Sequence, residues 1–282
     1  MLRRPDSYRL AAAALRENNK DLYFSTLVLP RRVRRHVQAL YSAVAEMAAV
    51  GEKVSEPGVG EIRLKWWADA LGGAELGDVR SSPVVDAALD TIEMFALPAA
   101  AFERMAAARR FDLYSDSMPN LTQLEGYAGE TSSVTYQMAA LIANGGKDPG
   151  TADAAGYLGV AEVLTRAIAG MPRDLSRGRV RVPLRVFAAT GVSEADLVAG
   201  KLSPGVVAAT AQLRAVARGY LEKSRTALRD VPKRVRPVFA PIVLAEKTLA
   251  GLEAAGADPF RPVPVWPDWR KLAAIVGFAL RT

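Results

Sequence analysis

Apolar residues recur at the three- and four-residue spacing of an amphipathic helix through almost the whole chain, and alanine fills many positions between them. This spacing gives a helix one buried face, whereas a strand needs alternation, and no segment alternates convincingly. The periodicity predicts helices over residues 7–17, 32–50, 60–72, 83–94, 99–114, 121–144, 151–169, 204–229, 234–255 and 269–280. An all-α fold follows.

Proline and glycine separate these segments, as helix-breaking residues do. Ser203 before Pro204 predicts an N-cap followed by the proline that is favoured in a first helical turn. The segment 258–268 holds four prolines and is expected to cross the surface before the last helix. No internal repeat and no long linker divides the chain, so we predict a single domain over residues 1–282.

Composition excludes several classes of function. The 282 residues include no cysteine, which excludes disulfides, thiolate nucleophiles and cysteine-based zinc sites. A net charge of +7 favours anionic partners. Nucleic acid is not expected among them, because aromatic residues do not interleave with the basic clusters and no groove-reading motif is present. No apolar run approaches the roughly 20 residues that span a bilayer, and the N-terminus lacks a signal-peptide core. We therefore expect a cytoplasmic protein or one attached peripherally to the inner face of a bacterial inner membrane.

Residues 158–183 read LGVAEVLTRAIAGMPRDLSRGRVRVP. They resemble, without a gap, a signature of squalene and phytoene synthases, G-x-A-x-Q-L-T-N-I-L-R-D-V-x-E-D-x-x-R-G-R-x-Y-L-P. The shared positions are Gly159, Ala161, Leu164, Thr165, Arg177, Gly178, Arg179 and Pro183. Gly170 stands at the first aspartate of the family's second D-x-x-x-D motif, and only the last aspartate remains, as Asp174, which we place in a loop after the helix.

A second resemblance lies near the N-terminus, where Arg34, Arg35 and Tyr41 fall in the family's F-x-S…L-P…R-R…A-L-Y opening. In active members the helix continues A-F-x-R-x-x-D-D-x-x-D. Here the positions of the arginine and the paired aspartates are alanines, and only the last acid remains, as Glu52; the alanines are Ala45, Ala48 and Ala49. Further along, Asp112 matches the aspartate of a D-L pair and Tyr127 the tyrosine of Y-C-x-x-V-A-G-x-V-G.

The resemblance implies a helical bundle of the isoprenoid synthase type, in which active members hold Mg²⁺ between the two aspartate-rich helices. Magnesium needs several hard oxygen ligands in near-octahedral geometry. Since only Glu52 and Asp174 survive, we expect no catalytic residue, no metal and no cofactor; if Mg²⁺ is bound, these two are its candidates. Ser133 and Tyr136 stand at glycine positions of the family, and Tyr136 is expected to narrow the hydrophobic tunnel.

Three functions follow from the resemblance. Residues 54–67 and 182–197 are similar to a catalytically degenerate branch that includes an assembly factor of mitochondrial respiratory complex I, NADH:ubiquinone oxidoreductase. The first hypothesis is therefore a non-catalytic protein whose partners are complex I subunits or other assembly factors, with an anionic membrane surface or an isoprenoid lipid as further candidates. The alternative is a magnesium-dependent head-to-head prenyl transferase acting on farnesyl or geranylgeranyl diphosphate. A third is isoprenoid binding without turnover. The candidate substrate-binding residues are Arg34, Arg35, Tyr41, Asp112, Tyr127, Arg177 and Arg179.

Overall fold

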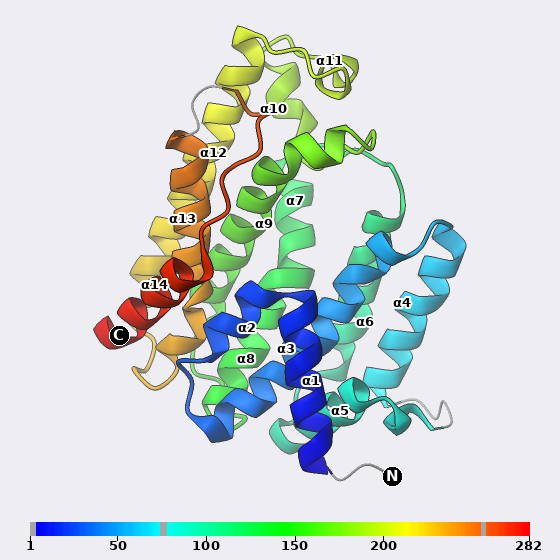
Figure 1. The fold of residues 1–282 in the computed structure, drawn as a ribbon, viewed down its shortest axis with the longest axis vertical. Helices are drawn as coiled ribbons and strands as arrows, with labels where there is room; N and C mark the ends of the chain where they lie inside the picture. The colour runs from blue at the N-terminus through cyan, green and yellow to red at the C-terminus, as the bar shows by residue number, and fades with distance from the viewer. Residues whose placement is uncertain (1–3, 74–77, 255–257) are drawn as a thin grey trace.

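Helix α9 (Ala152–Leu175) lies near the middle of the molecule, and several other helices pack around it (Figure 1). The computed structural model describes residues 4–73, 78–254 and 258–282, and every regular element in these ranges is a helix. The other α-helices are α1 (Arg4–Asn18), α2 (Lys20–Thr26), α3 (Arg31–Lys53), α4 (Pro57–Gly72), α5 (Pro83–Phe95), α6 (Ala99–Arg109), α7 (Leu121–Ala128), α8 (Val134–Ala143), α10 (Leu184–Ala188), α11 (Glu194–Val198), α12 (Pro204–Ala227), α13 (Pro241–Ala254) and α14 (Asp268–Arg281). Short turns of 3₁₀-helix are η1 (Val79–Ser81), η2 (Arg110–Leu113) and η4 (Arg236–Phe239), and η3 (Gly129–Ser133) is a π-helical turn.

One hydrophobic core joins most of these helices. Its largest side chains are fully buried and come from elements far apart in the sequence: Tyr41, Phe102, Tyr136, Phe187 and Phe239. Helix α12 lies along α9, and α1 lies along α3 (Figure 1). The predicted all-α, single-domain fold is confirmed.

Helix α9 is longer than the sequence predicted. We expected it to end at Ala169, but it continues through Pro172 to Leu175. Met171 and Leu175 are both buried, so they extend the apolar face of the helix by one turn. The free energy of burying these two side chains offsets the loss of the backbone hydrogen bond that Pro172 cannot donate. Asp174 consequently lies in the last helical turn, so its placement in a loop was wrong.

The predicted helix 121–144 is interrupted by the π-helical turn η3, where α9 approaches most closely. A Cβ atom added to Gly159 would lie 2.5 Å from the Ser133 backbone nitrogen and 2.7 Å from its Cα. Only glycine fits this contact. In this wider turn the Thr131 hydroxyl donates to the Tyr127 carbonyl oxygen at 2.7 Å. Such a bond from a threonine side chain to the carbonyl four residues earlier often accompanies a local distortion of a helix.

Two other predicted helices begin or end differently. The helix expected over 99–114 ends at Arg109 and gives way to the turn η2. The helix expected over 234–255 begins only at Pro241, because Pro237 and Pro241 lack the N–H groups that an earlier start would need, and its expected last residue, Ala255, lies outside the described residues. The predicted N-cap is confirmed, since the Ser203 hydroxyl accepts from the Val206 N–H at 3.2 Å.

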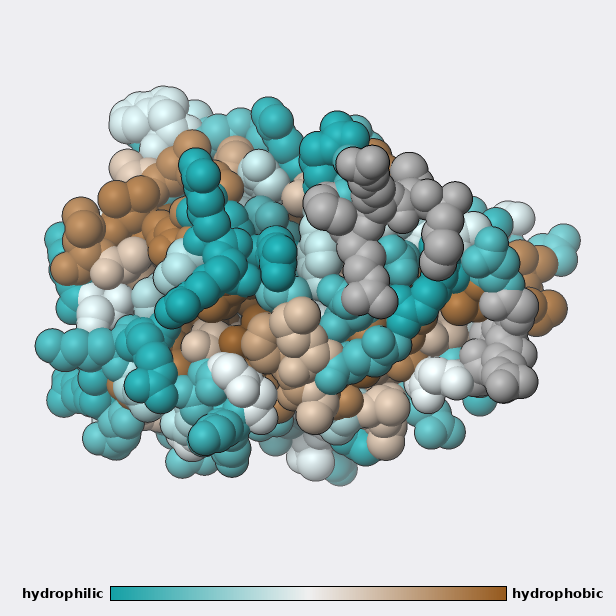
Figure 2. Space-filling view, turned by 90° about the horizontal axis from the view of Figure 1, so that it is seen from below, coloured by the Kyte–Doolittle hydropathy of each residue, from teal (hydrophilic) through white to brown (hydrophobic). Residues whose placement is uncertain are grey.

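The C-terminal helix α14 presents an apolar stripe to solvent. Four residues at positions i, i+4, i+7 and i+11 are exposed, namely Trp269, Ala273, Val276 and Leu280. Leu280 is 83% exposed and Trp269 is 65% exposed. Figure 2 shows hydrophobic side chains gathered at the left end of the viewed face, the side on which α14 lies in Figure 1. None of the helices that the structure describes is long and apolar enough to cross a bilayer.

The contact at Gly159 generates a prediction about stability. Gly159→Ala should lower the free energy of unfolding by about 2 kcal/mol or more, because the added methyl group meets backbone atoms of η3 that cannot move aside. Gly156→Ala is the matched control on the same helix, since its Cβ would meet nothing within 4 Å. That substitution should stabilise the helix by about 0.5–1 kcal/mol. Urea unfolding midpoints measure both, and equal effects of the two substitutions would contradict the close approach.

Candidate functional site

A cavity of about 300 Å³ opens between α3, η2 and the C-terminal half of α9. It is rich in guanidinium groups, which come from Arg109, Arg166, Arg173, Arg177, Arg179 and Arg181. Its three acidic side chains are Glu52, Asp112 and Asp174, and the floor contributed by α3 is formed by Ala45, Ala48 and Ala49. The six cations exceed the three carboxylates, so the cavity attracts anions.

Arg173 joins the two surviving motif acids, Glu52 and Asp174. Its Nη2 atom lies 3.1 Å from an Asp174 carboxylate oxygen and its Nη1 atom 3.7 Å from a Glu52 carboxylate oxygen. The Arg173 Nε–H also donates to Asp174 at 3.1 Å. The resemblance placed metal ions between these two helices. A guanidinium group of the chain itself lies between the two acids instead.

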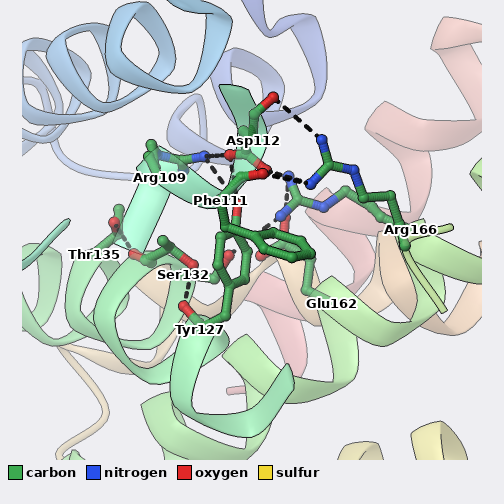
Figure 3. A network of polar contacts seen from close by, with 10 residues as sticks. Arg109, Phe111, Asp112, Tyr127, Ser132, Thr135, Glu162 and Arg166 are labelled. Carbon is green, nitrogen blue, oxygen red and sulfur yellow. Dashed lines mark hydrogen bonds and ion pairs between the residues drawn. The ribbon is translucent and has the colours of Figure 1, made fainter. Parts of the chain in front are cut away.

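The third acid, Asp112, is held by hydrogen bonds from three directions (Figure 3). The Tyr127 phenol donates to it at 2.8 Å, Arg109 at 3.4 Å and Arg181 at 3.3 Å. Burial and the adjacent Asp112 carboxylate raise the pKa of Tyr127 above its ordinary value, so the phenol keeps its proton and donates. Arg109 is almost completely buried, and its Nε–H has no hydrogen-bond partner among the described residues.

Local packing brings Asp112 to the cavity. The turn η2 lies directly against α3, where a Cβ atom on Gly51 would be 2.8 Å from the Asp112 carbonyl oxygen. Glycine at this position therefore permits the contact. Arg181 comes from the segment after α9 and also donates to the Asp112 carbonyl oxygen at 3.2 Å, which fastens that segment to η2.

Behind the cavity, the core is filled rather than open. Tyr136 is 1% exposed, and its ring lies 6.5 Å from that of Phe239. Its hydroxyl donates to Glu162 at 2.7 Å. Arg166 lies 3.7 Å from the same carboxylate group and donates to the Ser132 hydroxyl at 3.3 Å (Figure 3). Burial and Glu162 hold the pKa of Tyr136 well above its usual value. The tyrosine is thus part of the buried core, and narrowing of a hydrophobic tunnel by its ring stays a prediction.

The structure brings together six of the residues singled out from the sequence. Glu52, Asp112, Tyr127, Asp174, Arg177 and Arg179 all line the cavity. The side chains of Arg177 and Arg179 have no ion-pair partner in the described part of the chain, so both are available to an anion.

Three other candidate substrate-binding residues do not reach the cavity. Arg34 donates to the carbonyl oxygens of Leu27 and Leu29 and closes the turn before α3. Arg35 stacks on the Tyr8 ring at 5.3 Å and donates to His36, whose pKa is lowered to about 4 by burial. Tyr41 is fully buried, and its hydroxyl has no hydrogen-bond partner within the described ranges.

Four cavity arginines were not predicted from the sequence: Arg109, Arg166, Arg173 and Arg181. Arg166 and Arg173 lie inside the motif of residues 158–183, at positions where the family has asparagine and glutamate. Each change introduces a positive charge, and these changes could have been recognised in the sequence. Arg181 also lies in this motif, at the position of the family's tyrosine, and gives the same kind of signal. Arg109 carries no such signal, because its position depends on how η2 packs against the neighbouring helices.

The residues present do not fit Mg²⁺. A magnesium ion needs carboxylate oxygens that are free to coordinate it. Glu52 and Asp174 already pair with Arg173, and Asp112 is engaged by Arg109 and Arg181. Across residues 4–73, 78–254 and 258–282, no group of three or more acidic or histidine side chains is arranged to hold a metal ion.

Known proteins with similar sequences support both the helical fold and the resemblance in the motifs. The family model described as squalene/phytoene synthase matches residues 15–270. Complex I assembly factor 6 of Mus musculus is 25% identical over 259 residues, covering 92% of this chain and 77% of that protein. A phytoene synthase of Thermus thermophilus is 30% identical over 230 residues, covering 79% of this chain and 75% of that protein.

Solved structures show the same architecture. A dehydrosqualene synthase in complex with a ligand superposes with a TM-score of 0.85 at 18% identity, covering 99% of this chain and 97% of that one. A squalene synthase from Alicyclobacillus acidocaldarius gives a TM-score of 0.79 at 21% identity over 90% of this chain and 96% of that one. The bundle is therefore of the isoprenoid synthase type. Because the family model spans most of the sequence, the chain belongs to the squalene/phytoene synthase family.

Proposed function

We propose that this protein is a non-catalytic member of the squalene/phytoene synthase family that assists the assembly of respiratory complex I. The observation that carries the proposal is the arginine-rich cavity, in which Arg173 lies between Glu52 and Asp174 and alanines line α3. The similarity to complex I assembly factor 6 is the reason for proposing complex I as the partner.

The chemistry of the cavity supports the loss of prenyl coupling. Ionising an allylic diphosphate requires charge stabilisation that grows as the leaving group departs. Arginines that are fixed in ion pairs with carboxylates of the same cavity bind an anion at its periphery but provide no metal-bound cage for a departing diphosphate. In addition, the buried Tyr136 side chain, which is hydrogen-bonded to Glu162, fills core space next to the cavity and leaves less room for long prenyl chains.

A head-to-head prenyl transferase remains the second candidate function, because a phytoene synthase is 30% identical to most of the chain. Under this reading Arg177 and Arg179 would hold the diphosphate, and Glu52 and Asp174 would have to leave Arg173 to bind Mg²⁺. Binding of an isoprenoid without turnover is the third.

Deleting the gene from the organism that encodes it should lower the amount and activity of complex I severalfold. A plasmid copy carrying Glu52→Ala and Asp174→Ala should restore complex I fully, because neither carboxylate is needed for a scaffold. Succinate dehydrogenase activity is the control for general respiratory damage. Normal complex I in the deletion strain would refute the assembly role. Failure of the double variant to restore complex I, together with pyrophosphate release from farnesyl diphosphate by the wild-type protein, would establish the enzyme.

We further propose that the cavity binds anions without a divalent metal. Inorganic pyrophosphate should bind the purified protein in the presence of EDTA, and added Mg²⁺ should not strengthen binding. Replacing both Arg177 and Arg179 by alanine should weaken the affinity about tenfold or more, because each supplies a charged hydrogen-bond donor. Isothermal titration calorimetry measures this, with Arg185→Ala, an exposed arginine outside the cavity, as the control. Binding that requires Mg²⁺ would contradict the proposal.

Attachment to an anionic membrane surface is the location that we propose, with α14 as the attachment helix. An interfacial helix combines an apolar face with flanking basic residues and a tryptophan. The exposed stripe of α14 begins at Trp269 and ends at Leu280, and Arg270 and Arg281 are exposed beside it. The single acid of α14, Asp268, is neutralised by Lys20 at 2.5 Å. Each basic residue near such a surface contributes about 1 kcal/mol.

Vesicles that contain phosphatidylglycerol should co-sediment with the protein, and neutral phosphatidylcholine vesicles should do so far less. Leu280→Ser combined with Val276→Ser should lower vesicle binding about tenfold or more, since burial of both side chains in the interface is lost. Ile62→Ser is the matched control, because Ile62 is 72% exposed on α4, away from this helix. Equal losses from the two sets of substitutions would show that α14 is not the attachment face.

A further inference from the structure

The net charge of the chain is concentrated in three short segments. Residues 30–35, 144–150 and 228–236 together hold nine lysines and arginines but only two aspartates. Their excess of seven positive charges equals the net charge of +7 of the whole chain, so the rest of the chain is electrically balanced. The basic character of this protein therefore belongs to one set of residues, and we call the surface that these three segments form the basal face.

The fold brings the three segments to one end of the bundle. The Arg234 guanidinium donates to the Asn144 side chain at 2.8 Å, which joins the connection between α12 and α13 to the end of α8. Gly146 packs against the last turn of α5, since its Cβ would lie 3.0 Å from the Phe95 carbonyl oxygen. The Phe95 ring in turn lies 4.9 Å from the ring of His36, in the second turn of α3. This end of the molecule is the lower one in Figure 1.

Most of the basic side chains of the basal face are available to a partner. Five are exposed and have neither an ion pair nor a hydrogen bond within the described ranges, namely Arg31, Arg32, Lys147, Arg229 and Lys233. Arg31 and Arg32 lie in the first turn of α3, which contains no acidic residue. Cations at this end of a helix face the positive end of the helix dipole, which is unfavourable. Stabilisation of the helix therefore does not explain these cations, whereas an anionic partner would.

The apolar stripe of α14 ends beside the basal face. The Arg225 guanidinium, in the last turn of α12, lies 5.1 Å from the centre of the Phe278 ring of α14, and Arg229 follows one turn later. Helix α14 also contacts η4, which begins at Arg236. Leu280, 83% exposed, lies near the end of the helix. Figure 2, which views the molecule from below, shows hydrophilic side chains next to the hydrophobic group at the left end.

An anionic bilayer fits this surface better than an acidic peptide does. The cations project from three separate segments and so form a broad surface, whereas peptides bind in grooves or along sheet edges. Interfacial surfaces combine exposed apolar side chains with surrounding basic residues, and each basic residue near an anionic bilayer strengthens the attachment. A peptide would engage the charges but would not need the exposed end of α14.

The arginine-rich cavity lies at the opposite end of the two helices that connect it to the basal face. Helix α3 begins at Arg31, and its Glu52 lines the cavity. A helix rises about 1.5 Å per residue, so these two positions are about 32 Å apart along the axis. Helix α9 likewise follows the segment 144–150, and Asp174 in its last turn lines the cavity. A bilayer against the basal face would therefore leave the cavity on the far side.

We propose that the basal face lies on a bilayer of anionic lipid and that the arginine-rich cavity opens into water on the far side of the molecule. This orientation rests on the membrane attachment proposed for α14, but a different set of residues carries it. It leaves the cavity accessible to a water-soluble partner protein rather than to a molecule drawn from the bilayer.

Co-sedimentation with vesicles of equal parts phosphatidylglycerol and phosphatidylcholine tests the charge. Arg229→Gln combined with Lys233→Gln should weaken binding about tenfold or more, because two cations near the surface are lost. Arg63→Gln combined with Arg185→Gln is the matched control. Both control arginines are exposed and have no carboxylate partner in the described part of the chain, and they lie on α4 and α10, away from the basal face (Figure 1). Their loss should change binding less than about twofold, because distant charges are screened.

The orientation is tested with single labels, which the absence of native cysteine makes possible. Thr226→Cys places a bimane label on an exposed position one turn before Arg229, and Ser176→Cys places one at the exposed end of α9 beside the cavity. Addition of the vesicles should lower acrylamide quenching of the label at position 226 severalfold and leave quenching at position 176 unchanged. Equal circular dichroism spectra and unfolding midpoints establish that all variants fold.

Several outcomes would overturn the proposal. They are equal losses of vesicle binding from the basal and control pairs, and equal shielding of the labels at positions 226 and 176. Unchanged vesicle binding by the basal pair, together with lost binding of a polyglutamate peptide, would assign the face to an acidic protein instead.

These results separate the basal face from the other proposals. Vesicle binding that is lost on Leu280→Ser with Val276→Ser but not in the basal pair would refute the basal face and leave the attachment by α14 intact. Wild-type protein that does not bind the vesicles would refute both surfaces. The assembly role is decided independently by the amount of complex I in the deletion strain.

Discussion

The ion pairs of Arg173 with Glu52 and Asp174 are the constraint on which the site depends. In a metal-dependent site, acidic side chains on two helices repel each other until cations enter, so the site is incomplete without ligand. Here the neutralising charge belongs to the chain, although the contact from Arg173 to Glu52 on α3 is a 3.7 Å ion pair between exposed side chains. Asp112 follows the same rule, since Arg109 and Arg181 neutralise it. The remaining charge is an excess of arginine, which reverses the preference of the cavity from cations to anions.

Packing behind the cavity is consistent with this change in electrostatics. Tyr136 stands where the family frame has glycine, and its phenol needs a buried acceptor, which Glu162 supplies. The half-buried Glu162 carboxylate also lies 3.7 Å from the exposed Arg166 guanidinium, one turn further along α9. Tyr136, Glu162 and Arg166 therefore form a connected polar set that runs from the core to the edge of the cavity.

Much of the fold could be predicted from the sequence, because helix periodicity and proline or glycine breaks are local signals. The errors have physical causes that are not local. Pro172 lies within α9 because Met171 and Leu175 are buried, and the π-helical turn η3 lies where Gly159 lets two backbones meet. For the site, the motif residues Glu52 and Asp174 both line the cavity, whereas Arg34 and Arg35 contact neighbouring carbonyl and ring groups. The contacts of these two arginines depend on the conformation of the turn before α3, which the motif does not determine.

The C-terminal region gathers features that the family's motif frame does not explain. The proline-rich segment 258–268 covers an apolar cavity against α9 and α13, and α14 then turns one face inward to close that cavity and the other outward with its apolar stripe. Ala274 and Ala273 are adjacent in sequence but belong to these two different surfaces, because a helix rotates by about 100° per residue. Two ion pairs, Lys20 with Asp268 and Lys271 with Asp21, link α2 to α14. Consequently, α14 presents two different surfaces at once, one to the cavity and one to solvent.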